Sequence, residues 1–323
     1  MSTASRVPET WELTGDDAKE TFQRTGTVRL LKDGFRRFRV ADGFSHARSM
    51  AYAVTLVFLQ GIIALVGLAS AVGPKGLGGV AVNILHTVVP GPAGSVLTDA
   101  VQQAHKAGSS HRYLALIIGL TGALITGTTL MGQIERALNR IYGIEQDRPT
   151  GQKYGRAFVL TLSAGGLSII AFVALSLGSA IGESIKTSAF ATLWNIARWP
   201  LALVALAAGI ALVFRHCPRR RQPAWSWLAF GAGASVVLLL IVTIALNLMF
   251  QLSSTFGKTY GQLAGIVALM LWALFASIAL LLGAAFAAQL EAVRAGDGTP
   301  QSQAKVAASE PATAPEPVPA LGR

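Results

Sequence analysis

The stretch that decides the fold runs over residues 113–149, YLALIIGLTGALITGTTLMG followed by QIERALNRIYGIEQDRP. Its first part is apolar enough to cross a bilayer, and its second part is rich in charged residues. No proline interrupts the stretch before Pro149, so one helix can pass from the hydrocarbon into the headgroup layer. We therefore expect a membrane-spanning helix whose charged end projects from the bilayer.

Polar residues gather on one side of this helix when it is plotted at 100° per residue. Alternating steps of four and three residues place them on one stripe, which holds Gly122, Thr126, Thr129, Gln133, Arg136 and Arg140. A neighbouring stripe holds Thr121, Thr128, Glu135 and Asn139. Because an ionised side chain at mid-bilayer costs roughly 2.5–3.5 kcal/mol, the polar side should face other helices, a wet cavity or lipid headgroups.

The composition is that of a protein with many membrane crossings. The chain has 323 residues, of which 52% are hydrophobic and 13% charged, whereas soluble domains carry about 25% charged residues. These values predict an all-α polytopic membrane protein. The net charge of +11 is expected to set membrane orientation, and we expect no nucleic-acid partner.

Six apolar stretches are long enough to cross a hydrocarbon core of about 30 Å. They cover residues 49–72, 113–132, 157–180, 196–214, 226–250 and 260–290. Of the 27 Lys and Arg residues, 21 fall in the two terminal segments and in two of the loops, and six fall in the alternating loops. This bias predicts six spans with both termini in the cytoplasm, which places the chain as a multi-pass protein of a cytoplasmic membrane.

The predicted organisation has four parts. Residues 1–26 are expected to be a polar, flexible N-terminus, and residues 296–323, rich in Ala, Pro, Ser, Thr and Glu, a disordered cytoplasmic tail. Between them lie a basic amphipathic helix at 27–48 and the transmembrane domain at 49–295. The amphipathic helix has an apolar face for the acyl boundary and a basic face for anionic headgroups. A helix packed on the inner loops is the alternative.

Small residues mark the expected helix contacts. Gly257, Gly261 and Gly265 repeat every four residues at the start of the last span and let another helix approach closely. Packing within the chain is one interpretation, and the seam of a homo-oligomer is the other.

Residue patterns for catalysis or metal binding are missing from the sequence. The five histidines are scattered without ligand spacing, and there is a single cysteine, Cys217. We therefore expect no enzyme, no metal and no cofactor. Two carboxylates near the inner ends of spans, Glu135 and Glu291, are predicted either to take part in gating or to form ion pairs.

Three stretches together resemble the YihY/BrkB family of bacterial inner-membrane proteins, formerly labelled ribonuclease BN. They are the entry to the first span at Ala47, Met50, Ala51 and Tyr52, the run IERALNRIYGIEQDRP at 134–149, and Tyr260-Gly261 with LLLGAAFAAQLEAV at 280–293. The second run looks closer to the YhjD-like branch. Ala285 stands where many members have a glutamate, and Glu291 follows later.

The resemblance implies a six-helix bundle in the bacterial inner membrane. It also implies associations with envelope integrity, serum resistance and the export of lipids or small molecules. The nuclease label gains no support from the residues, because neither an acidic metal cluster nor a pair of catalytic histidines is visible.

The leading functional hypothesis is a transporter or flippase-like exporter of a lipid or amphiphilic anionic substrate that is not driven by ATP. Arg136 and Arg140 would bind the anionic headgroup, because guanidinium groups suit phosphate and carboxylate. Gln133, Thr129 and Thr126 would line the path. The alternatives are arginines that only anchor the helix, a scaffold for envelope integrity that transports nothing, and a membrane-bound nuclease.

Overall fold

The computed structural model is helical throughout the residues that it describes, which are 2–72, 112–168, 188–253, 256, 259–260, 263–296 and 299–303. Its helices follow the order α1 Gly15–Thr25, α2 Thr27–Val40, α3 Gly43–Val72, α6 Arg112–Ile141, α7 Thr150–Leu160, the π-helical turn η2 Thr161–Gly165, α9 Ser188–His216, α10 Trp225–Leu252 and α12 Ala264–Arg294. The only extended pairing among these residues is a single bridge between Ala4 and Ser302.

Five helices are long and apolar enough to cross a membrane. These candidate spans are Gly43–Ala64, Leu116–Ile141, Ile196–His216, Trp225–Leu252 and Ala264–Arg294. They coincide with five of the six predicted spans, and the first helix begins at Gly43 rather than at residue 49. The remaining predicted span, 157–180, lies only in part within the described residues, which stop at 168.

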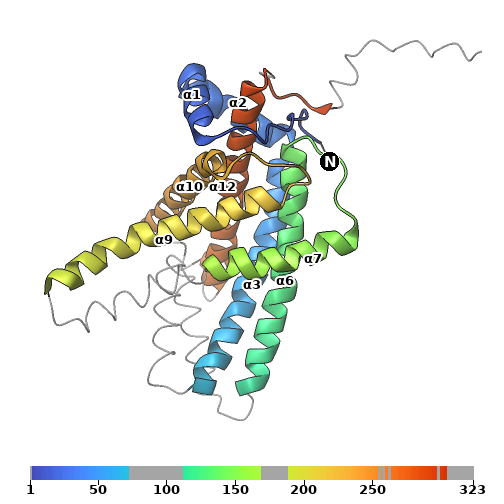
Figure 1. Ribbon diagram of the computed structural model, residues 1–323. Coiled ribbons are helices and arrows are strands. Elements are labelled where there is room, and N and C mark those ends of the chain that lie inside the picture. Colours follow the sequence, from blue (N-terminus) through green and yellow to red (C-terminus); the bar gives the residue numbers. More distant parts are fainter. Residues whose placement is uncertain are drawn as a thin grey trace, which may run out of the picture.

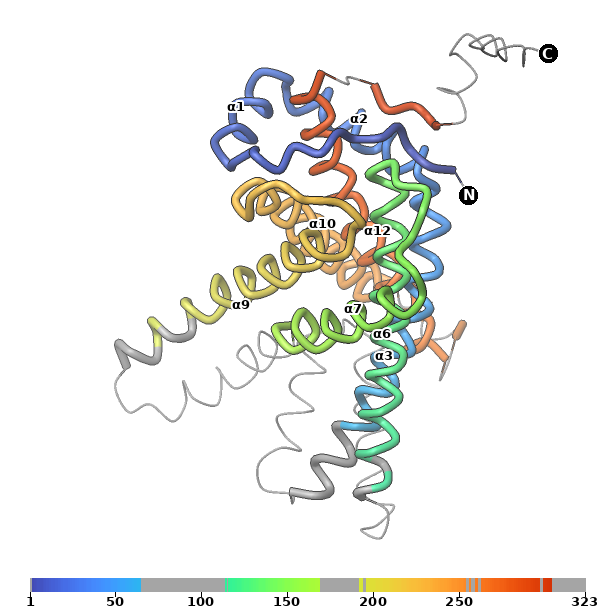
Figure 2. Tube along the Cα trace, turned by 45° about the vertical axis from the view of Figure 1, so that its right-hand side comes forward, coloured from blue at the N-terminus to red at the C-terminus, as the bar shows by residue number. Residues whose placement is uncertain are grey.

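The unbroken helix predicted from the stretch before Pro149 is confirmed. Helix α6 runs without a break from Arg112 to Ile141 and joins the apolar and charged halves of the stretch. It lies side by side with α3, and the views in Figures 1 and 2 show the two helices together over most of their length.

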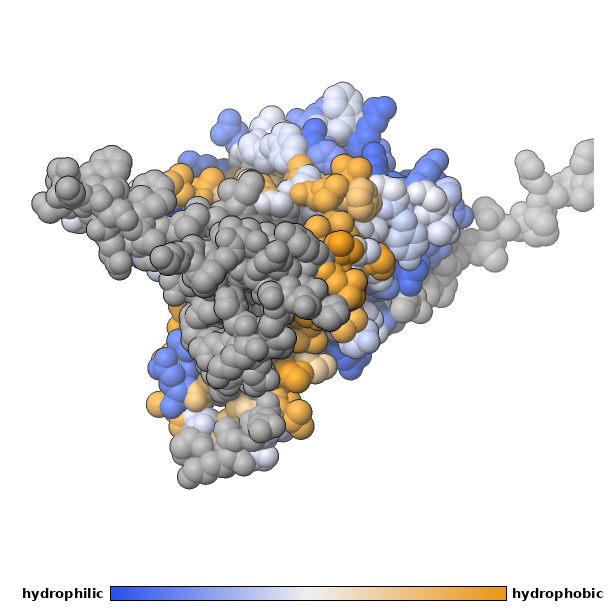
Figure 3. All heavy atoms as spheres, turned by 90° about the horizontal axis from the view of Figure 1, so that it is seen from below, coloured by the Kyte–Doolittle hydropathy of each residue, from blue (hydrophilic) through white to orange (hydrophobic). Residues whose placement is uncertain are grey.

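Glycines allow the closest helix approaches in the apolar body. A side chain at Gly119 of α6 would overlap the backbone of Ala64 in α3. A side chain at Gly283 of α12 would overlap the Ser235 hydroxyl and lie 2.6 Å from the carbonyl oxygen of Gly231, both in α10. Such contacts bring backbones together where hydrocarbon gives no hydrophobic driving force. On the face opposite α1 and α2, the described surface shows apolar side chains, with hydrophilic side chains toward its outer edge (Figure 3).

The predicted packing glycines fall unevenly on the described residues. Gly265 is buried in the first turn of α12. Gly257 and Gly261 lie outside the described residues.

The N-terminal region is folded, which differs from the flexible segment expected for 1–26. Helix α1 begins with a capping box in which Thr14 and Asp17 bond reciprocally. Gly26 separates α1 from α2 with a φ of 82°, which an L side chain adopts only with strain. The capping box and Gly26 thus mark the two ends of α1.

Helix α2 has one packed side and one exposed side. Leu30, Gly34 and Phe38 are buried, and a side chain at Gly34 would lie 3.5 Å from the Cα of Phe286 in α12. Val28 and Leu31 stay exposed. The helix therefore docks on the end of α12 and still presents an apolar surface.

Residues 2–13, which we call the strap, cross the end of the bundle. Ser5 N donates to Gln301 O at 2.6 Å, and Gln303 N donates to Thr3 O at 3.0 Å. Residues 299–303 were expected to be disordered but are held by this pairing, because the strap offers them backbone partners. Residues 304–323 lie outside the described part.

Candidate functional site at the charged end

The strap, the start of α3 and α10, and the ends of α6, α9 and α12 meet at one end of the bundle, which we call the charged end (Figure 1). Val7 N donates to Tyr142 O at 3.1 Å, just past the end of α6, and Ala224 N donates to Leu13 O at 3.1 Å, just before α10. The polar half of α6 therefore lies among the backbone of the strap and the charged side chains of the neighbouring segments.

Glu135 is buried on α6 and faces Arg148. Its Oε1 lies 3.2 Å from Nη1 of Arg148. The same guanidinium donates to the carbonyl oxygens of Cys217 at 2.6 Å and Pro218 at 2.8 Å. Arg148 therefore ties the end of α6 to the loop between α9 and α10.

The buried thiol of Cys217 lies in the same region. Burial, followed by the nearby Glu135 charge, raises the pKa of Cys217 to about 12. The thiol therefore stays protonated at neutral pH and lacks the thiolate character that a nucleophile needs.

Asp147 is the hub of a second cluster. Its carboxylate accepts from Nδ2 of Asn139 at 3.0 Å and from Nζ of Lys153 at 3.0 Å, and it lies 3.3 Å from Nε of Arg136. Burial opposes ionisation, but the hydrogen bonds from Asn139 and Lys153 outweigh it and lower the pKa of Asp147 below its ordinary value. Asn139 also accepts from the backbone N–H of Arg219 at 2.8 Å.

Arg140 holds the turn that follows α6. Its Nη1 donates to the carbonyl oxygens of Ile144, at 3.0 Å, and Glu145. In this turn Gly143 has a φ of 79°, and a side chain there would overlap the backbone of Arg6 in the strap. The glycine within the 134–149 run thus has a steric reason.

A second buried ion pair joins α12 to the α9–α10 loop. Glu291 pairs with Arg220 and accepts a hydrogen bond from the hydroxyl of Thr10 in the strap. Arg220 also donates to Pro8 O at 3.0 Å and lies 4.8 Å above the centre of the Tyr142 ring. Burial, followed by the Glu291 charge, raises the pKa of Tyr142.

Arg37 is fully buried and forms hydrogen bonds with three other segments. Its Nε donates to Oε1 of Gln289 at 2.9 Å, and its Nη1 donates to the carbonyl oxygens of Ser5 at 3.0 Å and Ile141 at 3.2 Å. One side chain of α2 thus reaches α12, the strap and the end of α6.

The predicted path residues lie along α6 below these clusters. Thr126 and Gln133 are half-buried, and Thr129 is exposed and donates to Ile125 O at 3.0 Å. Farther from the charged end, Gly122 faces the side chain of Gln60 in α3. Polar groups therefore continue from the charged end into the apolar part of the helix.

The two predicted headgroup-binding arginines already have partners inside the protein. The Arg136 side chain is 41% exposed beside Asp147, whereas Arg140 bonds the turn after α6. Arg136 therefore keeps part of its guanidinium exposed, and Arg140 is engaged with backbone carbonyl oxygens of its own chain.

Sequence reasoning missed Arg148, Arg220 and Arg37. The first two were counted as loop charges, and nothing in a single sequence reveals that their partners would be Glu135 and Glu291. A signal existed for Arg37, because it shares the spacing of Leu30 and Phe38 on the packed side of α2.

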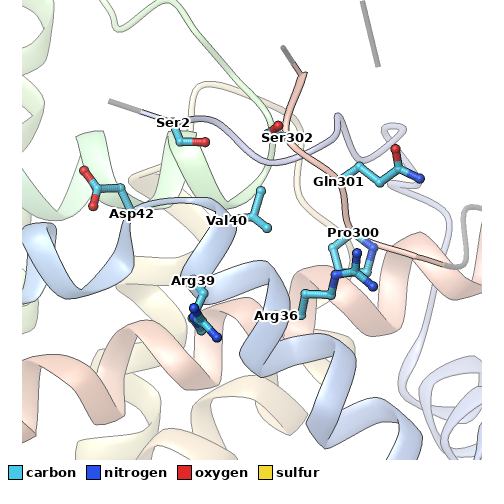
Figure 4. Close-up of a pocket in the computed structure, with 8 residues that line it drawn as sticks. All are labelled: Ser2, Arg36, Arg39, Val40, Asp42, Pro300, Gln301 and Ser302. Atoms are coloured by element: carbon cyan, nitrogen blue, oxygen red, sulfur yellow. The ribbon is translucent and has the colours of Figure 1, made fainter. Parts of the chain in front are cut away.

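Cavities open onto the charged end. One of about 440 Å³ lies between the chain start, the end of α2 and the residues near 301 (Figure 4). Arg36 and Arg39 of α2 line it, together with Asp42, Ser2 and Gln301. Among the described residues, no three His, Cys, Asp or Glu side chains gather as a metal site requires.

Comparison with known proteins places the chain in a family. The family model "Virulence factor BrkB" matches residues 34–308. YfkH of Bacillus subtilis (strain 168), whose name describes it as ribonuclease-like, is 22% identical over 79% of this chain and 93% of its own length. A UPF0761 membrane protein of Verminephrobacter eiseniae is 30% identical over 56% of this chain and 43% of its own.

A second UPF0761 membrane protein, from Chromobacterium violaceum, is 26% identical over 65% of this chain. The chain spans less than half the length of these two UPF0761 relatives. No solved structure matches it. Because the family model covers most of the chain, including the helices that build the charged end, this protein is a membrane protein of the BrkB family.

Proposed function

We propose that this protein is a transporter or flippase-like exporter of a lipid or amphiphilic anionic substrate in the bacterial inner membrane. The observation that supports the proposal is the polar line on α6. Thr126, Thr129 and Gln133 lead from the apolar body to the half-exposed Arg136 at the charged end. A helix that faced only lipid would gain nothing from this arrangement.

In this proposal the substrate's headgroup follows the polar line while its apolar part stays in hydrocarbon. Thr126, Thr129 and Gln133 contact the headgroup along the path, and Arg136 and Arg140 attract it at the cytoplasmic end. Glu135 and Glu291, each facing an arginine, hold the end of the path together as ion pairs. Movement is passive or driven by an ion gradient.

The topology that we propose has six crossings with both termini in the cytoplasm. The hydrogen bond between Ser5 and Gln301 supports it, because it puts the chain start and the end of the last span on one side. An even number of crossings must lie between those points. Five candidate spans are described, and the predicted span at 157–180 supplies the sixth.

A scaffold for envelope integrity is the second candidate. The folded N-terminal unit of α1 and α2 favours it, since Arg294 of α12 holds Asp17 and Glu20 of α1 at 3.0 Å each and so fixes a surface on which partners can dock. A scaffold would not need the polar line.

The test is translocation of fluorescent anionic and zwitterionic lipids in proteoliposomes. We expect the wild-type protein to move the anionic lipid and a Thr126→Val, Thr129→Val, Gln133→Leu variant to lose at least tenfold in rate. The matched control is Thr121→Val with Thr128→Val, which removes two hydroxyls from the same helix outside the polar line.

Two results would count against transport. Wild-type protein that moves no lipid, with or without a proton gradient, favours the scaffold. If the polar-line variant and the control lose the same translocation rate, the polar line on α6 is not the path of the substrate. Metal-dependent RNA cleavage by the same preparation would instead support the description carried by the name of YfkH.

A further inference from the structure

A cavity of about 370 Å³ opens beside the loop between α9 and α10 and is separate from the one in Figure 4. Its lining includes Arg148, Arg156, Arg215, Arg220, Arg221 and Gln222. We call it the arginine pocket. None of its described lining residues is a carboxylate.

The pocket carries positive charge that the described residues neutralise only in part. Arg148 faces Glu135 and Arg220 faces Glu291, so two of its arginines are paired. No carboxylate of the described residues lies within 4 Å of Arg156, of Arg215 or of Arg221. Guanidinium groups that line one cavity repel one another, and an anion between them would relieve that repulsion.

Polar atoms at the pocket also lack partners. Gln222 is only 8% exposed, and neither its Oε1 nor its Nε2 has a hydrogen-bond partner among the described residues. The Arg220 side chain is 2% exposed, and its Nη1 likewise has none, although Nη2 donates to Pro8. Buried polar groups in native proteins are normally bonded, so these atoms point to a ligand.

The pocket's arginines are held in place before any ligand arrives. Nη1 of Arg215 donates to Pro223 O at 3.0 Å, and its guanidinium lies 4.8 Å from the centre of the Trp225 ring. Arg148 is fixed by the carbonyl oxygens of Cys217 and Pro218. A preformed set of donors loses little conformational entropy on binding.

We propose that the arginine pocket binds a phosphate group, as a phosphate mono- or diester or as free phosphate. Arginine donors in a planar fork match phosphate oxygens, and the Gln222 amide adds a neutral donor. Trp11 of the strap also lines the pocket and is exposed, so its ring can cover an apolar group attached to the phosphate. Phosphate binding in the arginine pocket does not require that the protein transports a substrate.

The test is calorimetric titration of the purified full-length protein in an uncharged detergent. The probes are inorganic phosphate, dioctanoyl phosphatidic acid, dioctanoyl phosphatidylcholine and dioctanoylglycerol, which lacks phosphate. The pocket variant is Arg156→Gln with Arg221→Gln, because both side chains are exposed and neither joins an ion pair in the described residues. The matched control, Arg24→Gln with Arg48→Gln, removes the same charge from exposed positions outside the pocket.

We expect phosphate-bearing probes to bind, dioctanoylglycerol not to bind, and the pocket variant to bind at least tenfold more weakly than the control. Binding of inorganic phosphate that Trp11→Ala leaves unchanged supports a soluble phosphate. Binding of the phosphate-bearing lipids alone, weakened by Trp11→Ala, supports a lipid headgroup.

The proposal is overturned if no phosphate-bearing probe binds folded wild-type protein, or if the pocket variant and its control bind equally. Neither result depends on translocation, which is measured in vesicles. Binding without translocation would therefore leave this inference standing while the proposed transport fails.

Discussion

The charged end and the apolar body are held together in different ways. At the charged end, segments far apart in the chain meet through side chains, as when Arg37 reaches both Ser5 and Gln289. In the body, helices approach closely where a glycine has no side chain, as where Gly283 of α12 contacts Ser235 of α10. The charged end depends on polar side chains that bond one another, and the apolar body depends on glycines that let backbones approach closely.

The difference follows from the surroundings of each region. Hydrocarbon is as apolar as a leucine side chain, so helices in the body gain mainly from close van der Waals contact. At the charged end, buried carboxylates and guanidiniums need partners, because an unpaired buried charge is very costly. Each region should therefore fail under a different kind of substitution.

The largest effect is expected from breaking the buried ion pair at the charged end. Arg220→Met leaves the Glu291 carboxylate buried without its partner and should destabilise the protein by about 3–5 kcal/mol. Adding Glu291→Leu should recover most of the loss, because two apolar groups can replace a buried pair. Thermal unfolding in detergent measures the double-mutant cycle.

An exposed ion pair within α1 provides the control. Arg24→Gln removes an exposed contact with Glu20 and should change stability by less than about 1 kcal/mol. If the double variant at Arg220 and Glu291 is as unstable as Arg220→Met alone, the pair is not what holds the α9–α10 loop to α12.

A smaller effect is expected from filling the closest approach in the body. Gly283→Ala puts a methyl group against Ser235 and the backbone of Gly231, which should cost about 3 kcal/mol. Gly233→Ala, on the same helix pair, has no atom within 4 Å of its new methyl group and should be neutral or slightly stabilising. The two variants are compared by thermal unfolding and by size-exclusion profile, and equal profiles would show that α10 and α12 tolerate separation.

The smallest effect is expected at Asp147 and depends on pH. Because its pKa is lowered in the folded protein, its contribution is present above the ordinary value of 3.8 and is lost as pH falls through the lowered pKa. Asp147→Asn should cost about 1.5 kcal/mol at neutral pH. The gap in melting temperature between wild type and variant should shrink below about pH 4. A gap that stays constant down to pH 3 would mean that Asp147 does not act through its charge.

Sequence alone was sufficient to predict the helices that depend on residues close together in the chain. Hydropathy located five described spans, and the absence of proline before Pro149 predicted the unbroken α6. These outcomes depend on neighbours along the chain, which a single sequence contains.

The charged end depends on partners distant in the chain, and these were not predictable. Thr10 and Glu291 are bonded although they lie 281 positions apart in the chain. The folded strap was missed because a polar segment looks flexible until the surface that supports it is known. Gly283 was missed for a similar reason, since a close approach requires Ser235 on another helix.

The pairing of the strap with residues 299–303 sets an order of events during synthesis. Residues 3 and 5 leave the ribosome about 300 residues before their backbone partners at 301 and 303. At about 5–20 residues per second, the start of the chain waits roughly 15–60 s for those partners. The charged end can therefore close only after residue 303 has been made, and a chain cut short before residue 299 would be left open at this end.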